Sequence, residues 1–385
     1  MTVLYVLLAL FVFGLLVLIH ELGHFLVAKA FGVGIREFSI GMGPKLFSWK
    51  EKKKWGEADE PQPTQSEPDQ DANAIEPTNT DEIPEPEERV TTYSLRAFPI
   101  GGYVSMVGED EESESLASFE KKNVWKRIAI VLAGPLMNIL LGFLLMLILV
   151  LSTVHPETGK TVLLSNQIGA FQEGSVSHTV LQVDDVVTHV NGVRVRTGNE
   201  LVYEIMNQGY RPLDLKVIRG GEKVLLEDVV FPGMEAEGIS FGSADFKLYA
   251  EKITFGNVLK HTFFRSVSTV KMIFDQLGDL LTGRFGLNAV SGPIGVTEVM
   301  GDAAKDGFTT FLNLVIIITI NLGVFNLLPI PALDGGRLLF LLVEAITRKP
   351  LNKKIEGYIN LAGLMILFLI MIIVTGKDIV GLFIR

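Results

Sequence analysis

The first thirty residues constrain this chain more than any other stretch. Residues Val3–Ile19 form an unbroken apolar run, and His20-Glu21-Leu22-Gly23-His24 follows without leaving the helical pattern. About 20 apolar residues are enough to cross a bilayer as a helix. An ionisable side chain within such a span costs about 2.5–3.5 kcal/mol on insertion scales, so it is by default a functional candidate.

The five residues His20–His24 match the H-E-x-x-H pattern of zinc sites. In a helix, positions i and i+4 share one face, so His20 and His24 can bind one metal ion with Glu21 beside it as a base. Ala28-Lys29-Ala30 imitates a signal-peptide cleavage site. The missing basic n-region, the long apolar run and the ionisable residues before that site all argue against a removed signal.

The composition further limits which class of protein and which kind of metal site this chain can form. Apolar residues make up 48% of the 385 residues. The net charge is −10, but residues 57–88 hold twelve acidic and no basic residues, so the remainder of the chain has a net charge of +2. The acidity therefore belongs to one segment, and we expect no nucleic-acid partner. The chain has no cysteine, which excludes disulfides, thiol catalysis and thiolate zinc sites. Any metal must be held by histidines and carboxylates.

Apolar segments recur four times, which predicts an α-helical polytopic membrane protein with four transmembrane helices. The segments are Val3–Ala30, Ile128–Leu151, Phe308–Leu328 and Tyr358–Val374. Basic residues follow the first, precede the second and lie between the third and fourth. The positive-inside rule places these basic segments in the cytoplasm, with the N-terminus and residues 152–307 outside.

We expect the chain to divide into seven parts. They are a first transmembrane helix with the zinc motif (1–33), a cytoplasmic or re-entrant β region (34–123) with a disordered acidic insert (57–88), a second transmembrane helix (124–154), a PDZ-like α+β domain (161–249), an amphipathic helix and connecting loop (250–307), a third transmembrane helix with an Asp-Gly motif (308–347) and a fourth transmembrane helix (355–376).

The β region is predicted as a small sheet. Gly34–Ile40, Lys45–Trp49, Val90–Leu95 and Tyr103–Val107 have strand-like sequence. The acidic insert between them has almost no large apolar residue, so it cannot bury a core. We interpret it as a solvated spacer.

The 161–249 region carries local signatures of a separate domain. Leu181–Val187, followed by Val190-Asn191-Gly192, resembles the bacterial PDZ signature, with Asp184 where a glycine is usual. Aspartate tolerates the left-handed conformation of that turn. A PDZ groove captures an extended peptide or a terminal carboxylate, whereas a structural spacer without a competent groove remains the alternative.

Three further patterns predict local structure. Thr197–Glu200 is a capping box that opens a short helix closed near Gly209, and Gly220-Gly221 is a hairpin turn. Phe255–Leu281 repeats apolar residues at helical spacing, which predicts an amphipathic helix on the membrane or packed on the domain.

Two histidines leave a zinc site short of a ligand. The remaining histidines, His155, His178, His189 and His261, fall in the predicted outside region, away from His20 and His24 near the cytoplasmic end of the first span. The first and third spans run in the same direction, so Asp334, after the third span, lies at similar depth. We expect Asp334 to be the third ligand. A silent membrane chaperone or scaffold and a metal transporter are the rival hypotheses.

Several motifs together resemble the site-2 protease family of intramembrane zinc metalloproteases, in the branch of the bacterial regulator-of-sigma-E protease. The matching stretches are His20–Lys29, Gly101-Gly102-Tyr103-Val104, Gly134-Pro135-Leu136-Met137-Asn138 and Asn326–Gly336. With the PDZ-like domain they cover most of the chain in family order. The acidic insert and the single PDZ-like domain, where some members have two, are departures.

The resemblance implies His20, His24 and Asp334 as Zn²⁺ ligands and Glu21 as the catalytic acid–base. It implies an endopeptidase of the bacterial cytoplasmic membrane that cleaves transmembrane segments within the lipid bilayer. The implied substrates are single-pass anti-sigma factors and remnant signal peptides, with a peptide or ectodomain contacting the PDZ-like domain. Asn321 and Asn326 resemble positions that handle substrate.

Two further groups are candidates for substrate contact. Asn138 follows a proline in the second span, where its amide can hydrogen-bond the substrate or make a helix–helix hydrogen bond. The hairpin around Gly101 and Gly102 has an exposed strand edge that can pair with an unwound substrate segment.

Overall fold

The computed structural model describes residues 3–52, 90–109, 113, 115–153, 161–236, 239–284, 286 and 290–384. The acidic insert 57–88 and His155 lie outside the described residues. The chain divides into two compact units. The first comprises Met1–Ala9, Pro135–Gly336 and Gly357–Arg385, and the second comprises Leu10–Gly134 and Arg337–Glu356.

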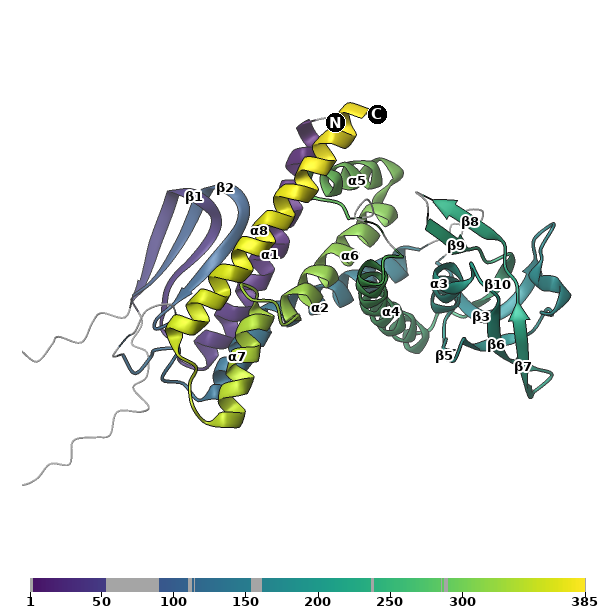
Figure 1. The fold of residues 1–385 in the computed structure, drawn as a ribbon, viewed down its shortest axis with the longest axis horizontal. Coiled ribbons are helices and arrows are strands. Elements are labelled where there is room, and N and C mark those ends of the chain that lie inside the picture. Colours follow the sequence, from purple (N-terminus) through teal and green to yellow (C-terminus); the bar gives the residue numbers. More distant parts are fainter. Residues whose placement is uncertain are drawn as a thin grey trace, which may run out of the picture. The chain divides into compact units, whose positions relative to one another are not determined.

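The helices and strands follow in chain order (Figure 1). The helices are α1 (Val3–Ala30), α2 (Val124–Ser152), α3 (Gly198–Gln208), α4 (Phe255–Leu281), α5 (Pro293–Asp306), α6 (Phe308–Leu327), α7 (Asp334–Thr347) and α8 (Lys353–Ile384). The strands are β1 (Ile35–Lys52), β2 (Val90–Met106), β3 (Leu163–Phe171), β4 (Val186–Val190), β5 (Val193–Arg194), β6 (Leu213–Arg219), β7 (Glu222–Val229), β8 (Gly233–Ala236), β9 (Ile239–Gly242) and β10 (Phe246–Glu251).

Four helices among the described residues are long and apolar enough to cross a membrane: Leu4–Ala30, Val124–Ser152, Phe308–Leu327 and Lys353–Gly381. They correspond to the four predicted apolar segments, and the chain is a polytopic membrane protein. The last helix extends beyond the predicted Tyr358–Val374 at both ends. Only 11% of its most apolar window is buried within the protein, so most of its apolar surface is available to lipid.

The second unit contains a sheet made from two long antiparallel strands. The sequence predicted four short strands, and the structure joins them in pairs, because β1 and β2 each fold back on themselves. Residues near Phe38 pair with both Val104 and Tyr93, and Trp49 pairs with Tyr93 from the other side. The bend in β1 falls at Gly41 and Gly43, whose φ angles of +83° and +86° are easily adopted only by glycine.

The core of the second unit joins this sheet to α1 and to the start of α2. Its buried residues include Phe25 and Ala28 from α1, Phe38 from β1, Met106 from β2 and Ile130 from α2. A Cβ on Gly23 would collide with the backbone at Ala133, so α1 and α2 approach more closely than larger residues would allow.

The first unit contains a second sheet with the strand order β10-β3-β4-β6-β7, and β5 pairs with β4. Its core is formed by side chains such as Ile168, Val187 and Leu215, all fully buried. Asp184 adopts a φ of +74°, the left-handed conformation expected there. The capping box is confirmed, since Thr197 accepts from the backbone of Glu200 and the Glu200 carboxylate accepts in return.

Two more local predictions are confirmed in this unit. Gly220 and Gly221 lie between β6 and β7, which pair as a hairpin across Arg219 and Glu222. The amphipathic helix spans Phe255–Leu281, as predicted, and packs on α6. The sequence did not predict α5, which begins with Pro293 in its first turn and follows no long apolar run.

Membrane helices of the first unit also pack closely. A Cβ on Gly142 of α2 would collide with Ile320 of α6, and one on Gly323 of α6 would collide with Ile139 and the carbonyl of Pro135. Small residues on both helices therefore permit the contact, as is common for helices in membranes.

Candidate active site

His24 is held in one orientation by the second helix. Its Nδ1 lies 2.8 Å from the backbone carbonyl of Ile130. A carbonyl only accepts hydrogen bonds, so Nδ1 must carry the proton, and Nε2 of the neutral ring keeps its lone pair. Metal-binding histidines usually donate their other ring N–H to a carbonyl or carboxylate in this way.

His20 presents its own Nε2 to this lone pair. The two Nε2 atoms lie 3.2 Å apart, and the rings meet edge to face with centroids 4.9 Å apart. Zinc binds imidazole nitrogen at about 2.0–2.1 Å with tetrahedral geometry, which places two such nitrogens about 3.3 Å apart. The pair therefore fits one zinc ion. Both histidines are 8% exposed, so the site is shielded from water.

Gly134 completes the packing around His24. An added Cβ at this position would collide with the Nε2, Cε1 and Cδ2 atoms of the ring. Only a residue without a side chain leaves room for the imidazole in this place. Gly134 belongs to one of the sequence motifs described above, but nothing in that motif predicts its contact with the histidine.

Glu21 faces the sheet of the same unit. Its Oε2 accepts a hydrogen bond from the backbone N–H of Val104, 3.2 Å away. Val104 lies in the segment of β2 that forms one edge of the sheet, since residues near it pair with β1 on one side only. The catalytic candidate and the strand edge are thus in direct contact. Sequence reasoning proposed both but did not connect them.

Gly101 and Gly102 lie where β2 passes along α1. A Cβ on Gly101 would come within 3.2 Å of Val17, and one on Gly102 within 3.3 Å of Leu18, both from α1. The two glycines therefore let the strand lie close against the helix that carries the motif.

Asp334 belongs to the first unit, where it begins α7. The turn before it folds back tightly, with Ile330 N–H on the carbonyl of Leu328 (2.7 Å) and Gly336 N–H on the carbonyl of Leu333 (3.1 Å). A Cβ on Gly335 would collide with Leu328, so the Asp-Gly-Gly sequence is needed to place a carboxylate here.

Helix α8 supports the Asp334 turn. Asn360 accepts a hydrogen bond from the backbone N–H of Ala332 (3.3 Å), and Gly363 packs against Pro331. Ala332 has a φ of +72°, a strained conformation for alanine. The turn is thus fixed by contacts beyond its own sequence.

The three predicted asparagines also lie in the first unit. Asn138 is fully buried against α6, where Thr319 donates to its backbone carbonyl (3.3 Å). Asn321 has a buried Oδ1 with no hydrogen-bond donor among the described residues. Asn326 is half-buried near the end of α6.

The other described histidines serve the sheet domain. His178 Nδ1 bonds the carbonyl of Ser175, His189 bonds Thr188, and His261 is buried against Glu251. Each has a structural partner of its own. That they are ordinary surface or packed histidines and do not bind zinc stays a prediction.

The sequence model of Peptidase family M50 matches residues 8–55 and 81–370. The regulator of sigma-W protease RasP of Bacillus subtilis is 30% identical, covering 97% of each chain. The zinc metalloprotease RasP of Shouchella clausii is 33% identical, covering 97% of this chain and 98% of its own. The zinc metalloprotease RasP of Bacillus licheniformis is 30% identical over the same shares.

Proposed function

This chain belongs to peptidase family M50 and is a zinc metalloprotease, and we propose that it cleaves peptide bonds inside the transmembrane segments of other proteins. The single observation that carries the proposal is the paired Nε2 atoms of His20 and His24 in a helix apolar enough to span a bilayer. A metal site placed there acts on peptide at membrane depth.

We assign His20, His24 and Asp334 as the zinc ligands. Two imidazoles and one carboxylate form a donor set suited to catalytic zinc, which keeps a fourth position for water or substrate. The protonated Nδ1 of His24 on the Ile130 carbonyl and the rigid turn before Asp334 would hold two of these ligands in place.

Glu21 is the proposed acid–base. Zinc in such a site supplies Lewis acidity that activates water and polarises the scissile carbonyl. Glu21 would take the proton of the attacking water and return it to the leaving amine. The Val104 N–H bonded to Oε2 of Glu21 restrains the position of this carboxylate.

Substrate would enter as an extended segment. A helical peptide bond is protected by its own hydrogen bonds, so the helix must unwind before hydrolysis. The edge of β2 at Gly102–Val104 offers backbone groups that can pair with such a segment beside Glu21. The buried Oδ1 of Asn321, which has no donor among the described residues, can accept a substrate N–H. We propose that Asn138 and Asn326 also contact the substrate.

The substrate class and topology follow from the family resemblance and from the charge pattern. We infer single-pass anti-sigma factors and remnant signal peptides as substrates, since one relative is named a regulator of a sigma factor. The N-terminus and the sheet domain would lie outside the cytoplasm. The sheet domain would act as a PDZ-like module, and the left-handed Asp184 in its turn supports this assignment.

The test uses purified protein and a tagged single-pass substrate. Glu21→Gln should lower cleavage by at least about 100-fold while zinc stays bound, because general acid–base catalysis contributes about 10²–10⁴-fold. The matched control is Glu356→Gln in α8, which is not in a described ion pair and should cleave normally. If Glu21→Gln cleaves at the wild-type rate with zinc bound, the proposed mechanism is wrong.

A further inference from the structure

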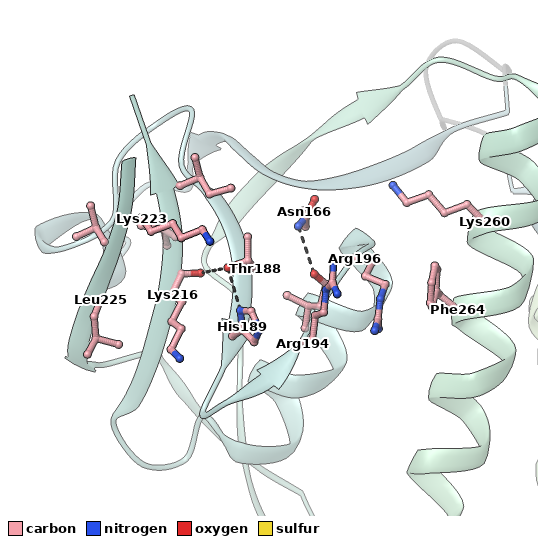
Figure 2. Close-up of a pocket in the computed structure, with 14 residues that line it drawn as sticks. Asn166, Thr188, His189, Arg194, Arg196, Lys216, Lys223, Leu225, Lys260 and Phe264 are labelled. Carbon is pink, nitrogen blue, oxygen red and sulfur yellow. Dashed lines mark hydrogen bonds between the residues drawn. The ribbon is translucent and has the colours of Figure 1, made fainter. Parts of the chain in front are cut away.

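The sheet domain of the first unit carries a row of basic side chains across neighbouring strands. Arg194 of β5 pairs with His189 of β4, and His189 pairs with Lys216 of β6. Lys223 of β7 pairs with Ile218, two residues from Lys216, and so lies diagonally beside it on the same face. Figure 2 shows these side chains gathered on one side of the strands.

These residues line a pocket that also includes α4. Its volume is about 960 Å³, and α4 contributes Lys260 and Phe264 (Figure 2). Five lysines and arginines line it, namely Arg194, Arg196, Lys216, Lys223 and Lys260. None of the described residues that line the pocket is acidic. The cavity is therefore strongly positive.

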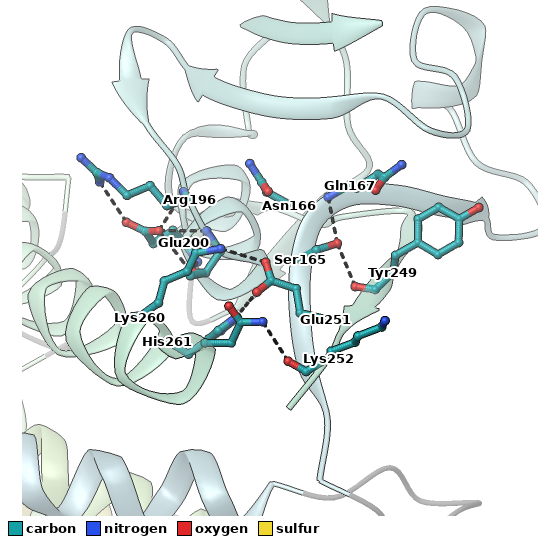
Figure 3. A network of polar contacts seen from close by, with 12 residues as sticks. Ser165, Asn166, Gln167, Arg196, Glu200, Tyr249, Glu251, Lys252, Lys260 and His261 are labelled. Atoms are coloured by element: carbon teal, nitrogen blue, oxygen red, sulfur yellow. Dashed lines mark hydrogen bonds and ion pairs between the residues drawn. The ribbon is translucent and has the colours of Figure 1, made fainter. Parts of the chain in front are cut away.

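Only part of this charge is neutralised within the protein. Lys260 pairs with Glu251 at 2.9 Å and Arg196 with Glu200 at 3.5 Å, as Figure 3 shows. Arg196 also stacks over Phe264, 4.5 Å from the ring centroid.

The other three, Arg194, Lys216 and Lys223, form no ion pair with any residue that the structure describes. Like charges on neighbouring strands are destabilising. A counter-charge in the pocket would relieve this repulsion.

We propose that this pocket binds the phosphate group of an anionic phospholipid. Arginine and lysine are the side chains that bind phosphate most readily. The volume falls in the range of small-molecule sites and exceeds what a single inorganic phosphate fills.

The exposed surface of α4 favours a ligand with acyl chains. Leu259, Phe263 and Val267 follow each other at intervals of four residues and are 38%, 53% and 48% exposed. This apolar row adjoins Lys260 and Phe264 on the same helix. A phospholipid can place its phosphate among the cations and its chains along this row.

His189 can report occupancy of the pocket. Burial lowers the pKa of His189, and the nearby charges of Lys216, Arg194, Arg196 and Lys223 lower it further. Lys260 faces the same pocket from α4, where its charge is paired with Glu251. A bound anion opposes these charges, so the pKa of His189 should rise when the ligand binds.

The experiment uses the full chain in a neutral detergent, with histidine-labelled protein for NMR and calorimetry for affinity. The probes are short-chain phosphatidylglycerol, short-chain phosphatidylcholine, glycerol phosphate and a short acidic peptide. The test variant is K216E/K223E, and the control is K247E/K252E, two exposed lysines of the same domain outside the pocket. Thermal unfolding checks that both variants fold.

Phosphatidylglycerol should bind the wild type and the control variant with equal affinity, and its binding should raise the pKa of His189. It should bind K216E/K223E at least 10-fold more weakly than it binds the wild type. Glycerol phosphate should bind at least 10-fold more weakly than the lipid, and phosphatidylcholine more weakly than phosphatidylglycerol. Equal lipid affinity in all three proteins would overturn the proposal. If glycerol phosphate binds as tightly as phosphatidylglycerol, the phospholipid assignment is overturned. If an acidic peptide binds more tightly than either, the pocket is a peptide site instead.

Discussion

Nδ1 of His24 donates to the carbonyl of Ile130 across 2.8 Å, which ties a residue of the first membrane helix to the backbone of the second. The bond selects the tautomer of His24 and leaves Nε2 facing Nε2 of His20. A backbone partner cannot be lost through a side-chain change, so the orientation depends on how closely the two helices approach.

Gly134→Ala tests this approach. The new methyl group would collide with the His24 ring, so the helices must separate or the ring must turn. We expect zinc affinity to fall about 10–100-fold, the usual effect of disturbing the groups that orient a metal ligand. Zinc content after dialysis against a graded chelator measures it.

Gly357→Ala in α8 is the matched control, because a Cβ there meets no atom within 4 Å. It should leave zinc binding unchanged, since alanine is favoured over glycine in a helix. Equal zinc affinity in both alanine variants would contradict the role given to Gly134.

Val104→Pro tests the contact between the sheet edge and Glu21. Proline removes the N–H that bonds Oε2 of Glu21 and is tolerated at a strand edge. A hydrogen bond to a charged group contributes about 1.5–3 kcal/mol, so cleavage should fall about 10–100-fold while zinc stays bound. Val104→Ala keeps the N–H and should cleave at close to the wild-type rate. Equal loss in both variants would assign the effect to the side chain.

The sequence predicted the four membrane helices and the histidine pair, because apolar runs and the i, i+4 spacing depend on nearby residues. It also predicted α4 and the α3 capping box to the residue. The long bent strands were missed, since the pairing of Phe38 with two segments of β2 is set by distant residues. Helix α5 was missed because its sequence is short and only weakly apolar. The Ile130 and Val104 contacts use backbone atoms, which leave no signature in the sequence.

Glu37 gives the sheet of the second unit a predicted acid sensitivity. Burial alone would raise the pKa of Glu37, but hydrogen bonds from Ser94, Arg96, Tyr103 and Lys45 outweigh it and lower the pKa to about 2. The folded pKa lies below the ordinary value near 4.5. The ionised carboxylate therefore stabilises the fold above about pH 4.5, and this contribution is lost as the pH falls towards 2.

Glu37→Gln should lower stability at pH 7 by about 1–2 kcal/mol, because it removes a charged hydrogen-bond acceptor. The midpoint temperature of thermal unfolding should then fall less steeply between pH 7 and pH 3 in the variant than in the wild type. Glu222→Gln, an exposed residue of the other sheet, should keep the wild-type pH profile. Parallel profiles for Glu37→Gln and wild type would contradict the assignment.

Asp185 and Arg219 form a two-pronged ion pair in the sheet domain. Nε of Arg219 donates to Oδ1 and Nη2 to Oδ2, each at 2.8 Å, and the carboxylate also accepts from Gln182 N–H. The Asp185 side chain is fully buried. Asp185→Asn leaves the guanidinium without its counter-charge, so the domain should lose about 2–4 kcal/mol of stability. Denaturant unfolding measures the loss, and Glu227→Gln, which is exposed, should unfold like wild type.

Asp334→Ala tests the third proposed ligand. Catalytic zinc sites use three protein ligands, so removing one should reduce zinc in the purified protein to less than about half of the wild-type content. Asp306→Ala, an exposed aspartate at the end of α5, is the control and should keep full zinc. Metal analysis by mass spectrometry gives the ratio of zinc to protein. Wild-type stoichiometry in Asp334→Ala would remove Asp334 from the ligand set and leave His20 and His24 in need of another partner.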